Sequence, residues 1–269
     1  KATSPVETVY DTLEALGDLS PDYISVTYGA GGSVVQNRTT ELSGFIKRKL
    51  KIEPMAHLTC INSGAYEVDK ILDELEELGI KNILALRGDI RADAVRGEFK
   101  YASDLISHIN KRGDFDIVAA CYPEKHPECS NIEMDIENLK RKADLGVGHL
   151  VTQMFFDNDN FYSFMDMIRA KGINQPVVAG IMPITNAAQI EKMSNMCGAF
   201  IPEKCLKMVE KYGNDPIAMR DAGIIYATNQ IMDLVANGVD GVHIYTMNNP
   251  YVARKITLSI GSIIGGDKL

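Results

Sequence analysis

The sequence lacks the features of membrane-spanning and nucleic-acid-binding proteins. No apolar run approaches the roughly 18 residues that a membrane span needs. Basic residues are outnumbered, because 28 Lys and Arg stand against 36 Asp and Glu, for a net charge of −8. Phosphate neutralisation needs clustered Lys and Arg, so this balance excludes a general nucleic-acid binder. A local basic pocket for one anionic ligand is still allowed.

Cysteine is scarce and unsuited to pairing. Its five positions are Cys60, Cys121, Cys129, Cys197 and Cys205, an odd number with no spacing closer than eight residues. Neither a disulfide framework nor a CxxC metal site fits this pattern. No signal peptide is visible, so we expect reduced structural thiols in a cytoplasmic protein.

Several catalytic motifs are missing from the sequence. HxH, HExxH and carboxylate–His spacings do not occur, so we expect no metal site, and the lack of GxSxG disfavours a serine hydrolase. The glycine-rich run Gly29–Ser33 departs from GxGxxG because Val34 takes the last glycine position, and it has no Walker lysine. The run is either a phosphate cradle of bare backbone N–H groups or a plain tight turn.

Short β-branched runs alternate with longer amphipathic stretches. We expect strands, nearly continuous in apolar residues, over residues 23–28, 55–60, 82–86, 117–122, 150–155, 177–181 and 241–245. We expect helices over 6–16, 66–78, 135–145, 161–170, 188–196, 221–236 and 251–260, most of them ending near a glycine, and an extra helix within 197–215.

This alternation predicts an α/β fold, a (β/α)8 TIM barrel. Seven strands preceded by a helix leave one strand missing, and we expect that first strand immediately upstream of Lys1. A seven-stranded open sheet is the alternative. No linker-like stretch or internal repeat occurs, so residues 1–269 are predicted to form a single domain.

Polar residues that a core does not need follow six of the seven predicted strands. They are Thr27 and Tyr28, His57 and Thr59, Arg87 with Asp89, Tyr122 with His126, Gln153, and His243 with Tyr245. Active sites of parallel barrels lie at the carboxyl ends of the strands, so we expect a site there. Two structural alternatives remain open. His57 is also compatible with a hydrogen-bonded histidine of the core, and Arg87 with Asp89 is also compatible with an ion pair on the surface.

The helix predicted after Tyr122 carries a polar stripe. Asp135, Asn138, Arg141 and Lys142 fall at offsets of zero, three, six and seven, on one face. Such a stripe either holds a ribose and a pyrophosphate or is a solvated helix face.

Nine segments, in order, resemble methylenetetrahydrofolate reductase, specifically the short bacterial catalytic type. They are SVTYGAGGS, AHLTC, ILALRGD, YASDL, AACYPEKHPE, NLKRKADLG, TQMFFD, GIMPIT and HIYTMN, from about residue 20 onwards. The resemblance implies an eight-fold barrel that holds FAD at its carboxyl rim. It also implies reduction of 5,10-methylenetetrahydrofolate to 5-methyltetrahydrofolate, a reaction of one-carbon metabolism and methionine biosynthesis. NADH, NADPH or a redox partner protein would reduce the flavin first, in a ping-pong scheme.

The resemblance also implies site residues. Flavin contacts fall by position on Thr27, Tyr28, His57, Leu86, Arg87, Gly88, Asp89, Tyr101, Ala102, Tyr122 and His126, and the ribose and pyrophosphate region on Asp135, Asn138, Arg141 and Lys142. Asp89 would stabilise the cationic iminium form of the substrate. Gln153 would bind folate and nicotinamide in turn, and Tyr245 would lie at the substrate mouth.

Two departures from the family pattern keep other functions open. The family's general acid is a Glu in an FEFFPP-like strand, which should lie just before Lys1, and Ala187 stands where an aromatic often stacks on the ligand. One alternative is a folate- or flavin-binding subunit that is inactive outside a complex. The other is a different FAD barrel, such as a proline-dehydrogenase-like oxidase. Homo-oligomer formation is compatible with either.

Overall fold

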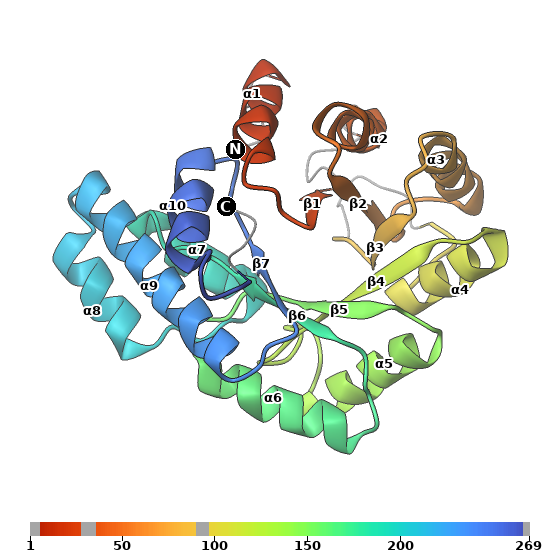
Figure 1. Ribbon diagram of the computed structural model, residues 1–269. Helices are drawn as coiled ribbons and strands as arrows, with labels where there is room; N and C mark the ends of the chain where they lie inside the picture. The colour runs from red at the N-terminus through yellow and green to blue at the C-terminus, as the bar shows by residue number, and fades with distance from the viewer. Residues whose placement is uncertain (1–5, 28–35, 90–96, 266–269) are drawn as a thin grey trace. The chain divides into compact units, whose positions relative to one another are not determined.

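Strands and helices alternate along the described residues, 6–27, 36–89 and 97–265 of the computed structural model (Figure 1). The chain divides into two units. The first unit is Lys1–Ala120 with Arg141–His149, and the second is Cys121–Lys140 with Leu150–Leu269. In the described ranges, no helix combines the length and the apolar character that crossing a membrane requires.

The first unit is built on parallel strands that follow chain order. These are β1 (Tyr23–Val26), β2 (Glu53–Thr59), β3 (Asn82–Leu86) and β4 (Asp116–Cys121), whose last residue belongs to the second unit. Its helices are α1 (Val6–Gly17), α2 (Gln36–Phe45), which continues into a π-helical turn (Ile46–Leu50), α3 (Ala65–Glu77) and α4 (Ala102–Arg112). Helix α2 packs on β1 and β2, and α4 packs on β3.

The second unit has the same plan. Its parallel strands are β5 (His149–Thr152), whose first residue belongs to the first unit, β6 (Val177–Ile181) and β7 (Gly241–Ile244). Its helices are α6 (Asn158–Ala170), α7 (Ala187–Cys197), α8 (Glu203–Tyr212), α9 (Pro216–Ala236) and α10 (Pro250–Ile260), while α5 (Ile132–Asp144) runs from this unit into the first. Helix α9 packs against both α8 and α10 (Figure 1).

The predicted barrel-type α/β fold is confirmed by this alternation of parallel strands and helices. Strands β3 and β6 have the predicted bounds, and the others differ only at their ends. The extra helix expected within 197–215 is α8. Helix α4 was not anticipated, and its missed signal is Asp104, whose carboxylate accepts from the backbone N–H of Lys100 and Tyr101, both at 2.9 Å. The upstream strand and the single domain stay predictions.

Capping residues start three helices of the second unit, α7 after β6, α9 after α8 and α10 after β7. The side chain of Asn186 accepts from Ala188 N–H at 2.9 Å to cap α7, and that of Asn249 accepts from Val252 N–H at 3.3 Å to cap α10. Asp215 caps α9 by accepting from two backbone N–H groups, with a proline in the first turn. These are ordinary N-cap signals, and they fix where each helix begins.

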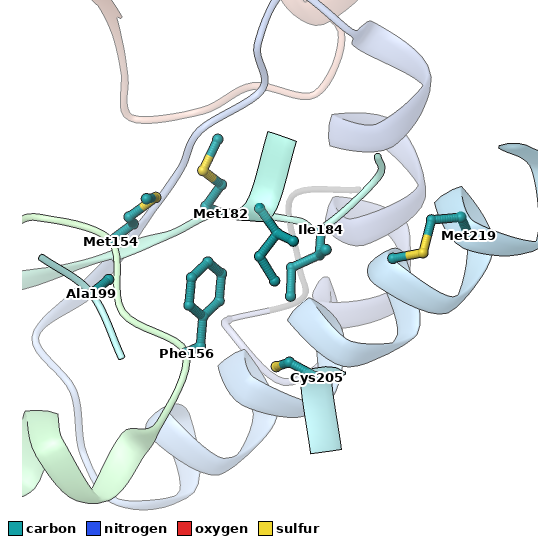
Figure 2. Close-up of a cluster of buried hydrophobic side chains, with 8 residues drawn as sticks. Met154, Phe156, Met182, Ile184, Ala199, Cys205 and Met219 are labelled. Atoms are coloured by element: carbon teal, nitrogen blue, oxygen red, sulfur yellow. The ribbon is translucent and has the colours of Figure 1, made fainter. Parts of the chain in front are cut away.

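A buried apolar cluster anchors the start of α9. Figure 2 shows Phe156 with Met182 and Ile184 beside it and Met219 of α9 across from Ile184. Gly223, one turn after Met219, lets the helix come against the chain that follows β6. A Cβ at Gly223 would lie only 2.0 Å from the carbonyl oxygen of Ile184. The first turns of α9 are therefore fixed against the β6–α7 segment by direct backbone contact.

We predict that Gly223→Ala destabilises the protein. Alanine improves helix propensity by about 1 kcal/mol, but the backbone contact leaves no space for its methyl group, so we expect a net loss of about 1–3 kcal/mol in the free energy of unfolding. Urea unfolding measures it. The control is Gly148→Ala, whose Cβ would lie 3.8 Å from the Ile117 carbonyl oxygen, an ordinary contact. Equal stability of the two variants would contradict the prediction.

Candidate functional site

In the first unit, the turn that follows β3 is held in place by its backbone. The carbonyl oxygen of Arg87 accepts from the N–H groups of Cys60 and Ile61, at 3.2 and 2.9 Å. The side-chain amide of Asn62 donates to the carbonyl oxygen of Asp89 at 2.8 Å. These bonds tie Arg87–Asp89 to the β2–α3 loop, with the Arg87 side chain half-buried and the Asp89 side chain exposed.

Gly88 gives this turn its conformation. Its φ is +82°, in the left-handed region that favours glycine, and a Cβ would lie 2.9 Å from Cβ of Thr59. His57 is half-buried on the same face of β2 as Thr59. Thr27 comes directly after Val26, which pairs with Ala56, so it lies level with His57 and is exposed. The structure thus gathers these predicted residues at one end of the first unit, while Tyr28 lies outside the described residues.

The thiol of Cys60 joins Tyr101 to this group. It is fully buried and lies 3.8 Å from the carbonyl oxygen of Arg87 and 3.6 Å from that of Tyr101. Burial is the main cause that raises the pKa of Cys60 to about 12. Tyr101 is the N-cap of α4 and is 52% exposed as a residue, and Ala102 is the first helical residue. Leu86 ends β3 and pairs with Thr59.

The polar stripe of α5 has local structural contacts in both units. In the first, Nζ of Lys142 donates to the carbonyl oxygen of Ala120 at 2.5 Å, and Arg141 is exposed. In the second, a carboxylate oxygen of Asp135 accepts from His126 N–H at 2.8 Å, and the amide of Asn138 lies 4.0 Å from Sγ of Cys129. The solvated-face alternative therefore fails for Asp135 and Lys142, which hold loop and strand backbone.

The loop after β4, in the second unit, is also fixed. The rings of Tyr122 and His126 meet edge to face, with centroids 4.7 Å apart. Nδ1 of His126 accepts from Glu128 N–H at 3.1 Å, so the neutral ring carries its proton on Nε2. Lys125 adopts φ +97°, an uncommon conformation for a residue with a side chain, and its ammonium donates to the Cys129 carbonyl oxygen at 2.7 Å.

Glu124, in the same loop, was missed by the sequence analysis. Its carboxylate accepts from the amide of Asn160 at 2.5 Å and from Phe200 N–H at 2.7 Å. Burial raises the pKa of Glu124, and these two hydrogen bonds oppose that rise. The contacts connect the loop to α6 and to the segment after α7. Because the partners are distant in the sequence, no local pattern could have revealed them.

Two predicted substrate residues lie at strand ends of the second unit. Gln153 follows β5, and its side-chain oxygen accepts from Met154 N–H at 2.9 Å. The hydroxyl of Tyr245, just after β7, donates to the carbonyl oxygen of Thr152 at 2.9 Å. Its ring crosses β6 at Gly180, where a Cβ would lie 2.8 Å from Cε2 of the ring. The glycine therefore permits the position of Tyr245, whose ring also meets that of His243 edge to face.

A cavity of about 250 Å³ opens beside Tyr245. Its described lining comes from the segments after β6 and β7 and from the first turns of α9 and α10, and includes Thr185, Asn186, Arg220, Thr246 and Asn249. Ala187, the residue that replaces an expected aromatic, packs against the end of α8. A Cβ at Gly213 would lie 3.1 Å from that of Ala187, so a larger side chain at position 187 would meet the α8–α9 connection.

In the described ranges, no group of three or more His, Cys, Asp or Glu side chains is placed to hold a metal ion. The five cysteines form no disulfide. The predicted residues lie partly in each unit, and their roles stay predictions.

Comparison with known proteins gives a consistent picture. The family model described as methylenetetrahydrofolate reductase matches residues 1–261. The chain is 35% identical over 260 residues to the 5,10-methylenetetrahydrofolate reductase of Escherichia coli (strain K12), covering 96% of this chain and 87% of that protein. It is 34% identical over 279 residues to "Methylenetetrahydrofolate reductase (NADH) 1" of Arabidopsis thaliana, covering 98% of this chain and 47% of that longer protein.

Solved structures of low identity share the fold. A Clostridium thermocellum protein, described as uncharacterized and as binding two copies of 5-methyl-5,6,7,8-tetrahydrofolic acid, superposes with a TM-score of 0.60 at 12% identity, over 94% of this chain and 88% of that one. A putative dihydrodipicolinate synthetase from Pseudomonas aeruginosa gives 0.54 at 10% identity, over 97% and 71%. At these identities the likeness shows the fold alone.

We predict that the buried thiol of Cys60 makes stability fall at alkaline pH. Burial raises its pKa to about 12 in the folded protein, from an ordinary value of 9.0. Below pH 9 the thiol is protonated in both states, and above it the unfolded chain releases a proton that the folded chain retains. Stability supplied by this group is thus present below pH 9 and is lost toward pH 12, by about 1.4 kcal/mol per pH unit.

Urea unfolding of the wild type and Cys60→Ala between pH 7.5 and 10.5 measures this loss. The difference between their free energies of unfolding should be constant up to about pH 9 and shrink above it. A difference that stays constant to pH 10.5 would show that Cys60 titrates normally.

Proposed function

This chain belongs to the methylenetetrahydrofolate reductase family of oxidoreductases, and we propose that it reduces 5,10-methylenetetrahydrofolate to 5-methyltetrahydrofolate with FAD as its cofactor. The observation that carries the proposal is the family match over residues 1–261. The fixed Arg87–Asp89 turn of the first unit adds support, because it presents a forked cation, bare backbone and a carboxylate within three residues.

FAD fits the donor set of the first unit. The cofactor has a ring edge rich in acceptors and an anionic pyrophosphate. Arg87 offers the planar donor fork that suits such an edge, and Gly88 lets backbone approach a ligand closely. Arg141 and Lys142 offer positive charge for the phosphates. The bound flavin supplies the hydride chemistry, and the protein residues bind and orient it.

The electron donor is a nicotinamide dinucleotide in this proposal. One relative, from Arabidopsis thaliana, carries NADH in its name. With FAD bound, NADH or NADPH would supply the reducing equivalents and would leave before the folate enters, in a ping-pong scheme. Gln153, whose side chain lies at the end of β5, would bind both substrates in turn. The five cysteines without a disulfide suit a cytoplasmic enzyme.

Asp89 has an electrostatic role in the folate half of the reaction. The substrate accepts a hydride as an iminium cation, and a carboxylate beside it stabilises that charge. The side chain of Asp89 is exposed while its backbone is held by Asn62, so the carboxylate is available on a fixed turn. Opening of the folate's five-membered ring also needs a proton at the leaving nitrogen.

We predict that the full-length protein binds one FAD and that Arg141→Ala/Lys142→Ala weakens it. Loss of charge-assisted contacts to the pyrophosphate is worth about 1.5–3 kcal/mol per bond, so the dissociation constant should rise at least tenfold. Fluorescence titration of the apoprotein with FAD measures it. The control Lys207→Ala/Lys211→Ala removes the same charge from α8 and should bind FAD as the wild type does. Equal FAD affinity of all three proteins would assign the α5 cations to structure alone.

We predict that Asp89→Asn slows folate reduction far more than flavin reduction. The substitution keeps shape and removes the charge that stabilises the iminium, worth about 2.7–4 kcal/mol, or roughly 100- to 1,000-fold in rate. Reduction of the flavin by the dinucleotide builds negative charge, which Asp89 does not favour, so that rate should be equal or higher. Stopped-flow absorbance resolves the two half-reactions.

Asp114→Asn is the control for Asp89, because it removes an exposed carboxylate of the same unit outside the turn. It should leave both half-reactions unchanged. If Asp89→Asn slows both halves equally, or spares folate reduction, the role given to Asp89 is wrong. If the wild type binds FAD and folate but neither NADH nor NADPH reduces it, the result would instead support the alternative of a binding subunit.

A further inference from the structure

Glu124 is a carboxylate of the second unit to which the proposed function gives no role. It lies in the loop between β4 and α5, and its side chain is half-buried. The carboxylate accepts from the side-chain amide of Asn160, in the first turn of α6, at 2.5 Å. It also accepts from the backbone N–H of Phe200, in the α7–α8 connection (residues 198–202), at 2.7 Å. One side chain thus joins the loop to two segments whose residues are 36 and 76 positions away in the sequence.

The same loop carries two residues predicted to contact the flavin. They are Tyr122 and His126, whose rings meet edge to face with centroids 4.7 Å apart, and Glu124 stands midway between them in the sequence. The next residue, Lys125, adopts φ +97°. A residue with a side chain keeps such a conformation only where surrounding contacts hold it. The contacts of Glu124 therefore bear directly on where the two rings lie.

Two other hydrogen bonds of the loop are local by comparison. The ammonium of Lys125 donates to the carbonyl oxygen of Cys129 at 2.7 Å, and the N–H of His126 donates to the carboxylate of Asp135 at 2.8 Å. These bonds hold the loop to itself and to the first turn of α5. Glu124, in contrast, fixes the loop against α6 and the α7–α8 connection, which come later in the chain.

Both partners of this carboxylate lie on packed segments. A Cβ at Gly198, which ends α7 with φ +72°, would lie 3.3 Å from Cγ of Pro127, so the α7–α8 connection packs on the loop. In the first turns of α6, Phe161 is buried and stacks on Phe155, with ring centroids 5.3 Å apart. The carboxylate is therefore held between two segments that are themselves fixed by packing.

We propose that Glu124 is a positioning residue of the flavin site, because it joins the β4–α5 loop to α6 and to the α7–α8 connection and so holds Tyr122 and His126 where the cofactor binds. The inference rests on the proposed function, since the flavin is the FAD of that reaction. Glu124 is assigned no contact with cofactor or substrate. A loop that is already held in place loses less conformational freedom when a ligand binds, so these contacts raise the affinity for FAD. By linkage, bound FAD in turn stabilises the contact with Phe200.

Fluorescence titration of the apoprotein with FAD tests the positioning role without requiring turnover. Glu124→Ala removes both hydrogen bonds and should raise the dissociation constant about tenfold. Glu124→Gln should recover most of the affinity. Its side-chain oxygen can accept from the N–H of Phe200, and its NH₂ group can donate to the side-chain oxygen of Asn160 once that amide is rotated.

Two further variants separate this contact from a general effect of charge. Asn160→Ala removes one of the two hydrogen bonds and should weaken FAD about threefold, and it carries the test if Glu124→Ala does not fold. Glu210→Ala is the control, because it removes an exposed carboxylate of α8 in the same unit, and it should bind FAD as the wild type does. Thermal unfolding of each apoprotein verifies that it is folded.

Hydrogen exchange distinguishes positioning of the flavin loop from a purely structural role. In the wild type, FAD should slow amide exchange over residues 198–201 about fivefold, although no residue there is predicted to contact the flavin. At saturating FAD, Glu124→Gln should retain this slowing and Glu124→Ala should lose it. A structural contact that is independent of the cofactor would give the same exchange with and without FAD.

Four outcomes would overturn the inference. They are FAD affinity equal to that of the wild type in both Glu124→Ala and Asn160→Ala, an equal loss in Glu210→Ala, a loss that Glu124→Gln does not recover, and exchange over residues 198–201 that FAD leaves unchanged in the wild type. Any of these, with FAD still bound by the wild type, would leave the proposed function standing. A wild type that binds no FAD would contradict the proposed function and, with it, the inference that rests on it.

Discussion

Close backbone approach at a few glycines determines how the carboxyl ends of the strands are arranged in each unit. In the second unit, Gly223 brings α9 against the carbonyl of Ile184, and Gly180 lets the Tyr245 ring cross β6. In the first, Gly88 turns the chain after β3 against Thr59. In every case a Cβ would lie under 3 Å from another atom. Residues near these contacts, among them Arg87 and Arg220, therefore start from a closely packed backbone.

The polar residues near these ends have structural contacts as well as predicted chemical roles. Lys142 holds the carbonyl of Ala120, Asp135 holds the backbone of His126, and Asp221 holds Arg220. A side chain that is already ordered loses less conformational entropy when a ligand arrives. Structural contact and ligand binding are thus compatible, and for a guanidinium or a carboxylate with several hydrogen-bonding positions they reinforce each other.

The sequence was sufficient for the fold because the strands are nearly continuous apolar runs, and β3 and β6 were predicted to the residue. The sequence also predicted that polar residues gather around Arg87, because the carboxyl ends of neighbouring parallel strands lie at the same edge of the sheet. It could not predict contacts between distant segments. Glu124 bonds Asn160 and Phe200, and Arg220 stands in an ordinary helical sequence with no motif. Only the packing of α9 reveals that Arg220 lines a cavity.

The net charge of the chain requires that the anion recognition that we propose be local. The chain has a net charge of −8, so its overall field repels an anionic cofactor or substrate. In physiological salt, screening limits interactions between charges to about 8–10 Å. Carboxylates farther than this from a binding site therefore add little repulsion, and the contacts at the site decide the affinity for the anion. A guanidinium fork and bare glycine backbone act only at contact distance. An acidic chain is therefore compatible with the anionic cofactor and substrate that we propose, while its net charge disfavours polyanions such as nucleic acid.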